Sequence, residues 1–202
     1  MSNPSIADRP VSVEEYLAGE PLSEIKHEYL GGVIYAMAGA SEAHNIISAN
    51  LLAGLVNRLR GKACRAFGAD MKVRLNLLGE TYFYYPDAMI ACDPADAGRN
   101  WRERPAALFE IISERTRRID EREKRMAYLQ LPSLEAYVRL EQVRAEAVVD
   151  LRSERGWTPH VLSGLNAVLK MPSLGIEAPL AEIYDGVEFE AAAAEERGER
   201  LS

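Results

Sequence analysis

Two apolar stretches that each contain one acid decide the fold of this chain: YFYYPDAMIAC at 82–92 and PAALFEIIS at 105–113. Apart from Asp87 and Glu110, both stretches are almost wholly apolar, which is typical of central strands covered on both faces. A polar loop over 93–104 separates them. We therefore expect the two stretches to form neighbouring strands of one sheet.

Further elements are predicted outward from this pair. Strands are expected at 64–75, 135–142, 145–153, 157–163 and 167–172, a hairpin at 27–39 that turns at Gly31-Gly32, and helices from Ser12 to Pro21, from Ser41 to Arg60 and over 119–131. This order favours a mixed α/β or α+β domain with a central sheet over a doubly wound fold. We expect a single domain over 1–190 and a disordered tail at 191–202.

Composition sets the broad class. Of 202 residues 48% are hydrophobic and 27% charged, with a net charge of −7, which excludes a fibrous or wholly disordered chain. No apolar run could span a bilayer, and the N-terminus lacks a secretory signal, so we expect a cytoplasmic protein without a membrane partner. Cys64 and Cys92 lack CxxC spacing and are interpreted as reduced, small core residues.

Asp87 and Glu110 are the residues most indicative of chemistry. A lone buried carboxylate is costly, so such acids are usually paired, hydrogen-bonded or metal-bound. Glu110 and Ile112 share a strand face, because side chains alternate along a strand. Two adjacent carboxylates and a backbone carbonyl, taken as that of Ile112, form an oxygen site suited to Mg²⁺. The alternative is that each acid bonds an arginine or a backbone amide for structural reasons.

Lys124 is the next candidate, because it lies on the helix that follows the Glu110 strand. Asp120 and Lys124 have the i,i+4 spacing of one helix face. If that face packs over the strand end, the ammonium reaches the metal site and can orient water or stabilise charge in phosphoryl transfer. The alternative is a solvated ion pair between Asp120 and Lys124.

Several ordered blocks carry a family resemblance. They are EYLGGVIYAMAGASEAHNIISANL at 28–51, GADMKVRL at 68–75, YFYYPDAMIACD at 82–93 and PAALFEIISERTRRIDEREKRMAYLQLPSLEAYV at 105–138. Over about residues 11–185 the chain resembles the Uma family of restriction endonucleases, a branch of the PD-(D/E)XK nuclease superfamily. The resemblance implies a restriction-endonuclease-like core, a central mixed sheet flanked by helices, and Mg²⁺-dependent hydrolysis of DNA.

The resemblance also assigns roles to the central residues. Asp87 matches the acid of the Pro-Asp half of the superfamily motif, and Glu110 matches the acid of the second half. The superfamily lysine falls at position 112, where this chain has Ile112. Lys124 matches the helix lysine of the Uma family, so the resemblance implies a migrated catalytic lysine.

Two further residues match the family near the N-terminus. Glu28 matches an acid ahead of the core, which implies an additional metal or water ligand, with a hairpin salt bridge as the alternative. His44 matches a histidine that could approach the phosphate or the metal, with capping or packing as the alternative.

The sequence thus predicts an Mg²⁺-dependent endodeoxyribonuclease, with Mn²⁺ as a substitute ion, DNA as substrate, and a homodimer by fold analogy alone. Asp87, Glu110 and the Ile112 carbonyl would hold the metal, and Lys124 would contact the water or the phosphate. The alternative is a non-catalytic nucleic-acid-binding or interaction module that keeps the nuclease fold, suggested by the isoleucine at the lysine position.

Overall fold

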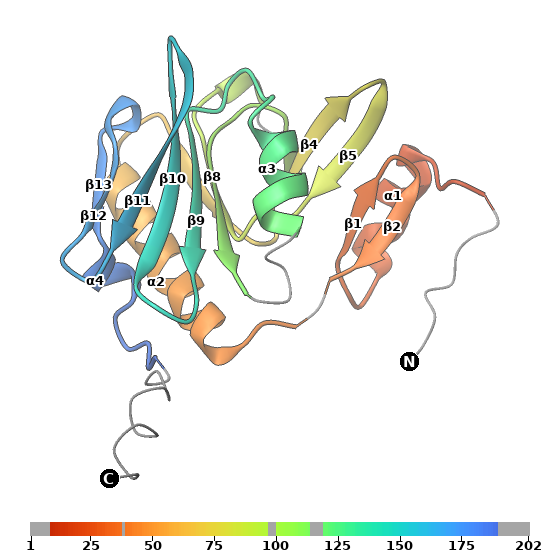
Figure 1. The fold of residues 1–202 in the computed structure, drawn as a ribbon. Coiled ribbons are helices and arrows are strands. Elements are labelled where there is room, and N and C mark those ends of the chain that lie inside the picture. The colour runs from red at the N-terminus through yellow and green to blue at the C-terminus, as the bar shows by residue number, and fades with distance from the viewer. Residues whose placement is uncertain (1–8, 38, 97–99, 114–118, 190–202) are drawn as a thin grey trace, which may run out of the picture.

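The computed structural model describes residues 9–37, 39–96, 100–113 and 119–189, and arranges them as three sheets with flanking helices (Figure 1). The six-stranded sheet has the order β11 (Gly156–Ser163), β10 (Glu146–Ser153), β9 (Ala136–Glu141), β8 (Pro105–Ile112), β6 (Ala88–Ala91) and β3 (Arg65–Gly68). In it β8 pairs parallel with β9 and antiparallel with β6. The expectation of a mixed α/β fold with a mixed central sheet is confirmed, while the tail at 191–202 lies outside the described residues.

The other two sheets are smaller. The five-stranded sheet has the order β2 (Val33–Ala36), β1 (His27–Leu30), β5 (Glu80–Tyr84), β4 (Lys72–Leu77) and β7 (Trp101–Arg102), and the two-stranded sheet pairs β12 (Val168–Met171) with β13 (Ile176–Pro179). The hairpin predicted at Gly31-Gly32 is β1–β2 of the five-stranded sheet. Both glycines have positive φ, 57° and 98°, which a side chain would make unfavourable.

Local capping explains where the first two α-helices begin. The helical segments are α1 (Val13–Gly19), α2 (Glu42–Leu59), α3 (Arg125–Tyr128), α4 (Leu180–Ile183), a π-helix (Ile119–Lys124) and 3₁₀ turns at Glu20–Leu22, Pro94–Asp96 and Pro172–Leu174. Ser12 and Glu15 form a complete capping box at α1. At α2 the Ser41 hydroxyl accepts from the His44 amide at 3.1 Å, as the sequence predicted.

The core is organised around β8, whose eight residues are all buried. On one face of the six-stranded sheet, Phe109 packs in a cluster with the apolar stripe of α2, which consists of Ile47, Leu51, Leu55 and Leu59. On the other face, Leu108 packs in a cluster with Tyr128 of α3. Helices therefore cover both faces of the central strand, as its continuous apolar sequence indicated (Figure 1).

Two stretches predicted as single strands each divide between two sheets. Residues 64–75 form β3 and β4, separated by a turn after Gly68, and residues 82–92 contain β5 and β6, separated at Tyr85-Pro86. In both stretches the chain leaves one sheet and enters the other. The prediction of one strand in each was wrong, because strand-like composition does not show where a chain changes sheets.

The prediction of reduced thiols was also wrong. Cys64 and Cys92 are joined by a disulfide with an S–S distance of 2.04 Å. Arg65 pairs with Ala91 in the β3–β6 register, so the next residues outward, the two cysteines, face each other. Sequence spacing alone did not give this register.

None of the helices within the described ranges is long and apolar enough to cross a membrane.

Candidate active site

Asp87 and Glu110 lie opposite each other in the six-stranded sheet. Ala88 pairs with Phe109 in the β6–β8 register, so Asp87, directly before β6, faces Glu110 of β8. The carboxylate of Asp87 reaches the backbone edge of β8, where its Oδ2 accepts a hydrogen bond from the Ile111 amide at 2.7 Å. The Asp87 side chain is 14% exposed and that of Glu110 4%. At the start of β6, Asp87 therefore contacts the residue of β8 that directly follows Glu110.

Lys124, the last residue of the π-helix, contacts Glu110. Its Nζ is 3.3 Å from Oε1 of Glu110 and 3.0 Å from Oε1 of Glu28. The residue is only 6% exposed, so the alternative of a solvated Lys124 is wrong. The side chain of Asp120, its predicted partner, lies outside the described residues.

Glu28 reaches the same place from the five-stranded sheet. It lies on β1, and its Oε1 accepts a hydrogen bond from the Tyr85 amide at 3.3 Å, two residues before Asp87. Its side chain is 13% exposed and contacts Lys124. The two larger sheets therefore meet at the Lys124 ammonium, which contacts one carboxylate from each.

His44 approaches from α2. The Ser41 cap begins that helix, and in its first turn Nε2 of His44 lies 3.1 Å from Oδ1 of Asp87. The second Asp87 oxygen, Oδ2, accepts from the Ile111 amide at 2.7 Å. Asp87 is thus held from α2 on one side and from β8 on the other. We refer to Glu28, His44, Asp87, Glu110 and Lys124 as the acidic cluster.

The Ile112 carbonyl does not point towards Asp87. It accepts from the Gln142 amide at 3.2 Å and therefore faces the β9 side of β8, whereas Asp87 lies on the β6 side. The Ile111 amide points to Asp87, and the N–H and C=O of one strand residue point the same way. Thus Ile111, not Ile112, presents its carbonyl towards the β6 side, while the Ile112 side chain is buried.

Tyr128 was missed by the sequence analysis. Its hydroxyl donates to Oε1 of Glu110 at 3.0 Å, and the residue is fully buried. Burial and the nearby charge of Glu110 raise the pKa of the Tyr128 hydroxyl well above its usual range, so it stays protonated. Tyr128 lies four residues after Lys124, a spacing that puts both on one helix face and could have identified it.

The acidic cluster has an excess of negative charge. Three carboxylates, from Glu28, Asp87 and Glu110, surround one ammonium and one imidazole. Over the described ranges, no three His, Cys, Asp or Glu side chains are arranged to hold an ion by themselves. The paired carboxylates with a backbone carbonyl nearby nevertheless match the oxygen donors that Mg²⁺ prefers, with water completing its shell. The donor chemistry therefore fits a divalent cation.

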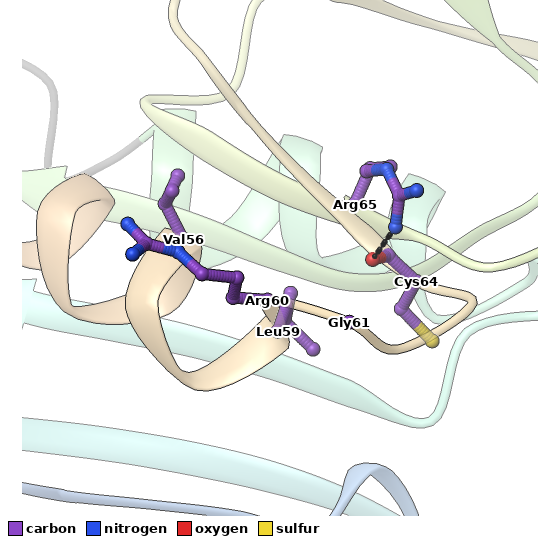
Figure 2. A pocket seen from close by; sticks show the side chains of 6 residues that line it. All are labelled: Val56, Leu59, Arg60, Gly61, Cys64 and Arg65. Atoms are coloured by element: carbon purple, nitrogen blue, oxygen red, sulfur yellow. Dashed lines mark hydrogen bonds between the residues drawn. The ribbon is translucent and has the colours of Figure 1, made fainter.

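A surface cavity elsewhere offers no comparable chemistry. It measures about 260 Å³ and lies at the end of α2, lined by Val56, Leu59, Arg60, Gly61, Cys64 and Arg65. In Figure 2 the guanidinium groups of Arg60 and Arg65 point apart, and Arg65 donates to the Cys64 carbonyl. None of the acidic cluster lines this cavity.

The sheets and helices define a nuclease-like α/β fold. The structure superposes on the crystal structure of a "putative nuclease belonging to DUF820" from Anabaena variabilis with a TM-score of 0.69, covering 87% of this chain and 98% of that one at 15% identity. At this identity the likeness concerns the fold alone.

The chain belongs to the Uma2 family, described as "Putative restriction endonuclease", whose model matches residues 13–181. This confirms the resemblance drawn from the sequence blocks. Two relatives come from Synechocystis sp. and are named as uncharacterized proteins. The first, slr1290, is 30% identical over 190 residues, which cover 93% of this chain and 98% of the relative. The second, sll1609, is 27% identical over 171 residues, which cover 82% and 95%.

Proposed function

We propose that this chain is a metal-dependent endonuclease that hydrolyses phosphodiester bonds in DNA. Membership of a nuclease family supports the reaction class. The observation that carries the proposal is the position of Asp87 on the backbone of β8 next to Glu110, through the Ile111 amide, with the buried Lys124 ammonium against Glu110. Phosphodiester hydrolysis needs positive charge beside the scissile phosphate, and this cluster can hold both a divalent cation and a lysine there.

Asp87, Glu110 and the Ile111 carbonyl are the residues we assign to metal binding. When bound, Mg²⁺, or Mn²⁺ in its place, would supply Lewis acidity towards the phosphate and lower the pKa of water. The Ile111 carbonyl replaces that of Ile112 in this proposal. The Ile111 amide donates to Asp87, and the carbonyl of the same residue points to the same side of β8.

The remaining residues have separate roles. Lys124 supplies a fixed positive charge for the phosphate, and Glu28, 3.0 Å from its Nζ, orients the ammonium. His44 contacts Asp87 through Nε2 and sets the orientation of that carboxylate. The Tyr85 amide in turn holds Glu28.

One observation favours a second function, a non-catalytic DNA-binding module. Position 112, where the nuclease superfamily has its lysine, carries a buried isoleucine that brings no charge. In that function the acidic cluster would be structural, and metal would not be needed. The two functions differ in one property: the nuclease would cleave DNA when a divalent metal is present, and the binding module would not.

A cleavage assay tests the proposal. Purified protein is incubated with plasmid, linear, single-stranded and branched DNA in Mg²⁺, in Mn²⁺ or in EDTA. We expect cleavage of at least one DNA with metal and none in EDTA. DNA binding without cleavage in any metal would contradict the proposal and support the binding module.

Two substitutions make the assay specific to the site. Glu110→Gln should abolish cleavage, because it removes one of the two carboxylates that we assign to metal binding. Glu177→Gln is the control: Glu177 is an exposed acid that pairs with Lys170 on the two-stranded sheet. Equal cleavage by the Glu110→Gln protein would point to a contaminating nuclease or a different site.

A further inference from the structure

Tyr128 places a buried hydroxyl against the Glu110 carboxylate. The contact to Oε1 is 3.0 Å, and the same oxygen lies 3.3 Å from Nζ of Lys124. Lys124 and Tyr128 are one helical turn apart, so one helix face supplies both donors. Glu110, only 3% exposed, is therefore held by two groups from the same short helical segment.

The ring of Tyr128 packs between two other aromatic rings. It makes edge contacts with Tyr84 and Tyr137, with ring centroids 5.6 Å and 5.4 Å away. An aromatic ring packed on two sides cannot easily turn its hydroxyl elsewhere. The hydroxyl therefore stays directed at the Glu110 carboxylate, to which it donates at 3.0 Å.

We propose that Tyr128 is a positioning residue for Glu110, fixing the plane of its carboxylate so that the acid can bind a divalent cation together with Asp87. The inference rests on the proposed function and adds a residue to it. Groups that hydrogen-bond a ligating carboxylate orient it, and their loss typically weakens metal binding 10–100-fold.

Tyr128→Phe separates this role from packing, because it keeps the ring and removes only the hydroxyl. The matched control is Tyr184→Phe. Tyr184 is also buried, and its hydroxyl donates to the carbonyls of Glu141 and Glu146 at 2.8 Å and 2.7 Å. It belongs to the core cluster on the opposite, α2-facing side of the six-stranded sheet. Both variants lose buried hydrogen bonds, but only one loses a contact to Glu110.

The test measures Mn²⁺ binding to the full chain without DNA, from the electron paramagnetic resonance signal of free Mn²⁺. We expect the Mn²⁺ Kd to rise 10–100-fold in Tyr128→Phe and to stay within twofold in Tyr184→Phe. Circular dichroism verifies that both variants fold. A Kd within twofold of wild type in Tyr128→Phe would overturn the proposal, as would an equal weakening in Tyr184→Phe.

Cleavage measured beside binding distinguishes failure of this inference from failure of the proposed function. Wild-type protein that binds Mn²⁺ but cuts no DNA, with the weakening confined to Tyr128→Phe, would support the positioning role and contradict the nuclease. Metal-dependent cleavage by the wild type, with unchanged Mn²⁺ binding in Tyr128→Phe, would support the nuclease and contradict the positioning role. Wild-type protein that binds no Mn²⁺ would overturn the positioning role.

Discussion

At the scale of single residues, the central feature is one buried ammonium shared by the buried carboxylate of Glu110 and the partly buried carboxylate of Glu28. Lys124 contacts Glu28 and Glu110, and its Nζ lies 5.8 Å from the centroid of the Tyr84 ring. Charges this deep are stable only when paired, since water cannot solvate them. Lys124 therefore stabilises the folded acidic cluster as well as providing charge for the proposed reaction.

Replacing Lys124 with alanine should lower both the rate of DNA cleavage and the stability of the fold. We expect the single-turnover rate of DNA cleavage to fall about 10²–10³-fold, the usual cost of losing a donor to transition-state charge. We expect the free energy of unfolding to fall by about 3–5 kcal/mol, because the buried carboxylate of Glu110 and the partly buried one of Glu28 lose their cation. Rapid-quench cleavage at saturating Mg²⁺ and urea denaturation measure the two effects. A rate equal to wild type would remove Lys124 from the proposed mechanism.

The sequence identified most of this cluster but not its internal geometry. Single acids in apolar stretches pointed to Asp87 and Glu110, and the family blocks added Glu28 and His44. Which carbonyl of β8 faces Asp87 depends on the phase of strand pairing, which the residue types do not encode. Hence the sequence predicts the Ile112 carbonyl, whereas the Ile111 carbonyl has the suitable orientation.

At the scale of elements, the position of the lysine-bearing helix is set by a buried ion network. Asp150 of β10 has no exposed surface and accepts from Arg125 Nε at 3.0 Å and Nη2 at 2.6 Å, and from Arg139 Nη2 at 2.8 Å. Arg125 directly follows Lys124. The α-helical part of this segment is only four residues long, so it depends on such contacts rather than on its own stability.

Asp150→Ala should therefore be strongly destabilising. We expect the free energy of unfolding to fall by about 3–5 kcal/mol, because two arginines lose their buried partner. The control Lys170→Ala removes an exposed ion pair and should change it by less than about 1 kcal/mol. Urea denaturation of both variants measures the difference. A similar small loss in both would show that the network does not anchor the helix.

Sequence patterns predicted the elements better than their connections. The capping residues Ser12 and Ser41 and the apolar stripe of α2 gave both helices close to their observed bounds. The division of 64–75 and 82–92 between two sheets was not predicted, because strand-like residues on both sides of a break do not show which sheet each half joins. Only the tertiary structure separates them.

At the scale of the whole molecule, a covalent link joins the end of β6 to the start of β3. The Cys64–Cys92 disulfide spans a sequence separation of 28 residues, a loop that includes β3, β4, β5 and β6. Closing such a loop lowers the entropy of the unfolded chain. It also ties together both ends of a segment that passes through two sheets and contains Asp87.

Removing this disulfide should lower stability. We expect Cys64→Ala, or reduction with dithiothreitol, to decrease the free energy of unfolding by about 3–4 kcal/mol for a loop of this size. Urea denaturation with and without reductant measures the change. Two titratable thiols in unfolded protein that was never exposed to reductant would contradict the disulfide itself.

Buried tyrosines predict how stability responds to alkali. Burial raises the pKa of the Tyr184 hydroxyl, so between pH 10 and its folded value the unfolded chain has lost that proton while the folded chain keeps it. The contribution is complete below pH 10 and is lost as the pH rises, by about 1.4 kcal/mol per pH unit. Tyr184→Phe should make this decline shallower by about that amount in urea denaturation between pH 11 and 12, where the unfolded tyrosine is deprotonated. An unchanged slope of the free energy of unfolding against pH would contradict the raised pKa of Tyr184.

The central claim is that Asp87 and Glu110 together form a centre for a divalent cation. Anomalous diffraction from a crystal soaked in Mn²⁺ tests it most directly, with an Asp87→Asn crystal as the control. The account predicts a Mn²⁺ peak bonded to the carboxylates of Asp87 and Glu110 in the wild type, and none there in Asp87→Asn. A wild-type map with no peak at these carboxylates, or with Mn²⁺ bound only elsewhere, would contradict it.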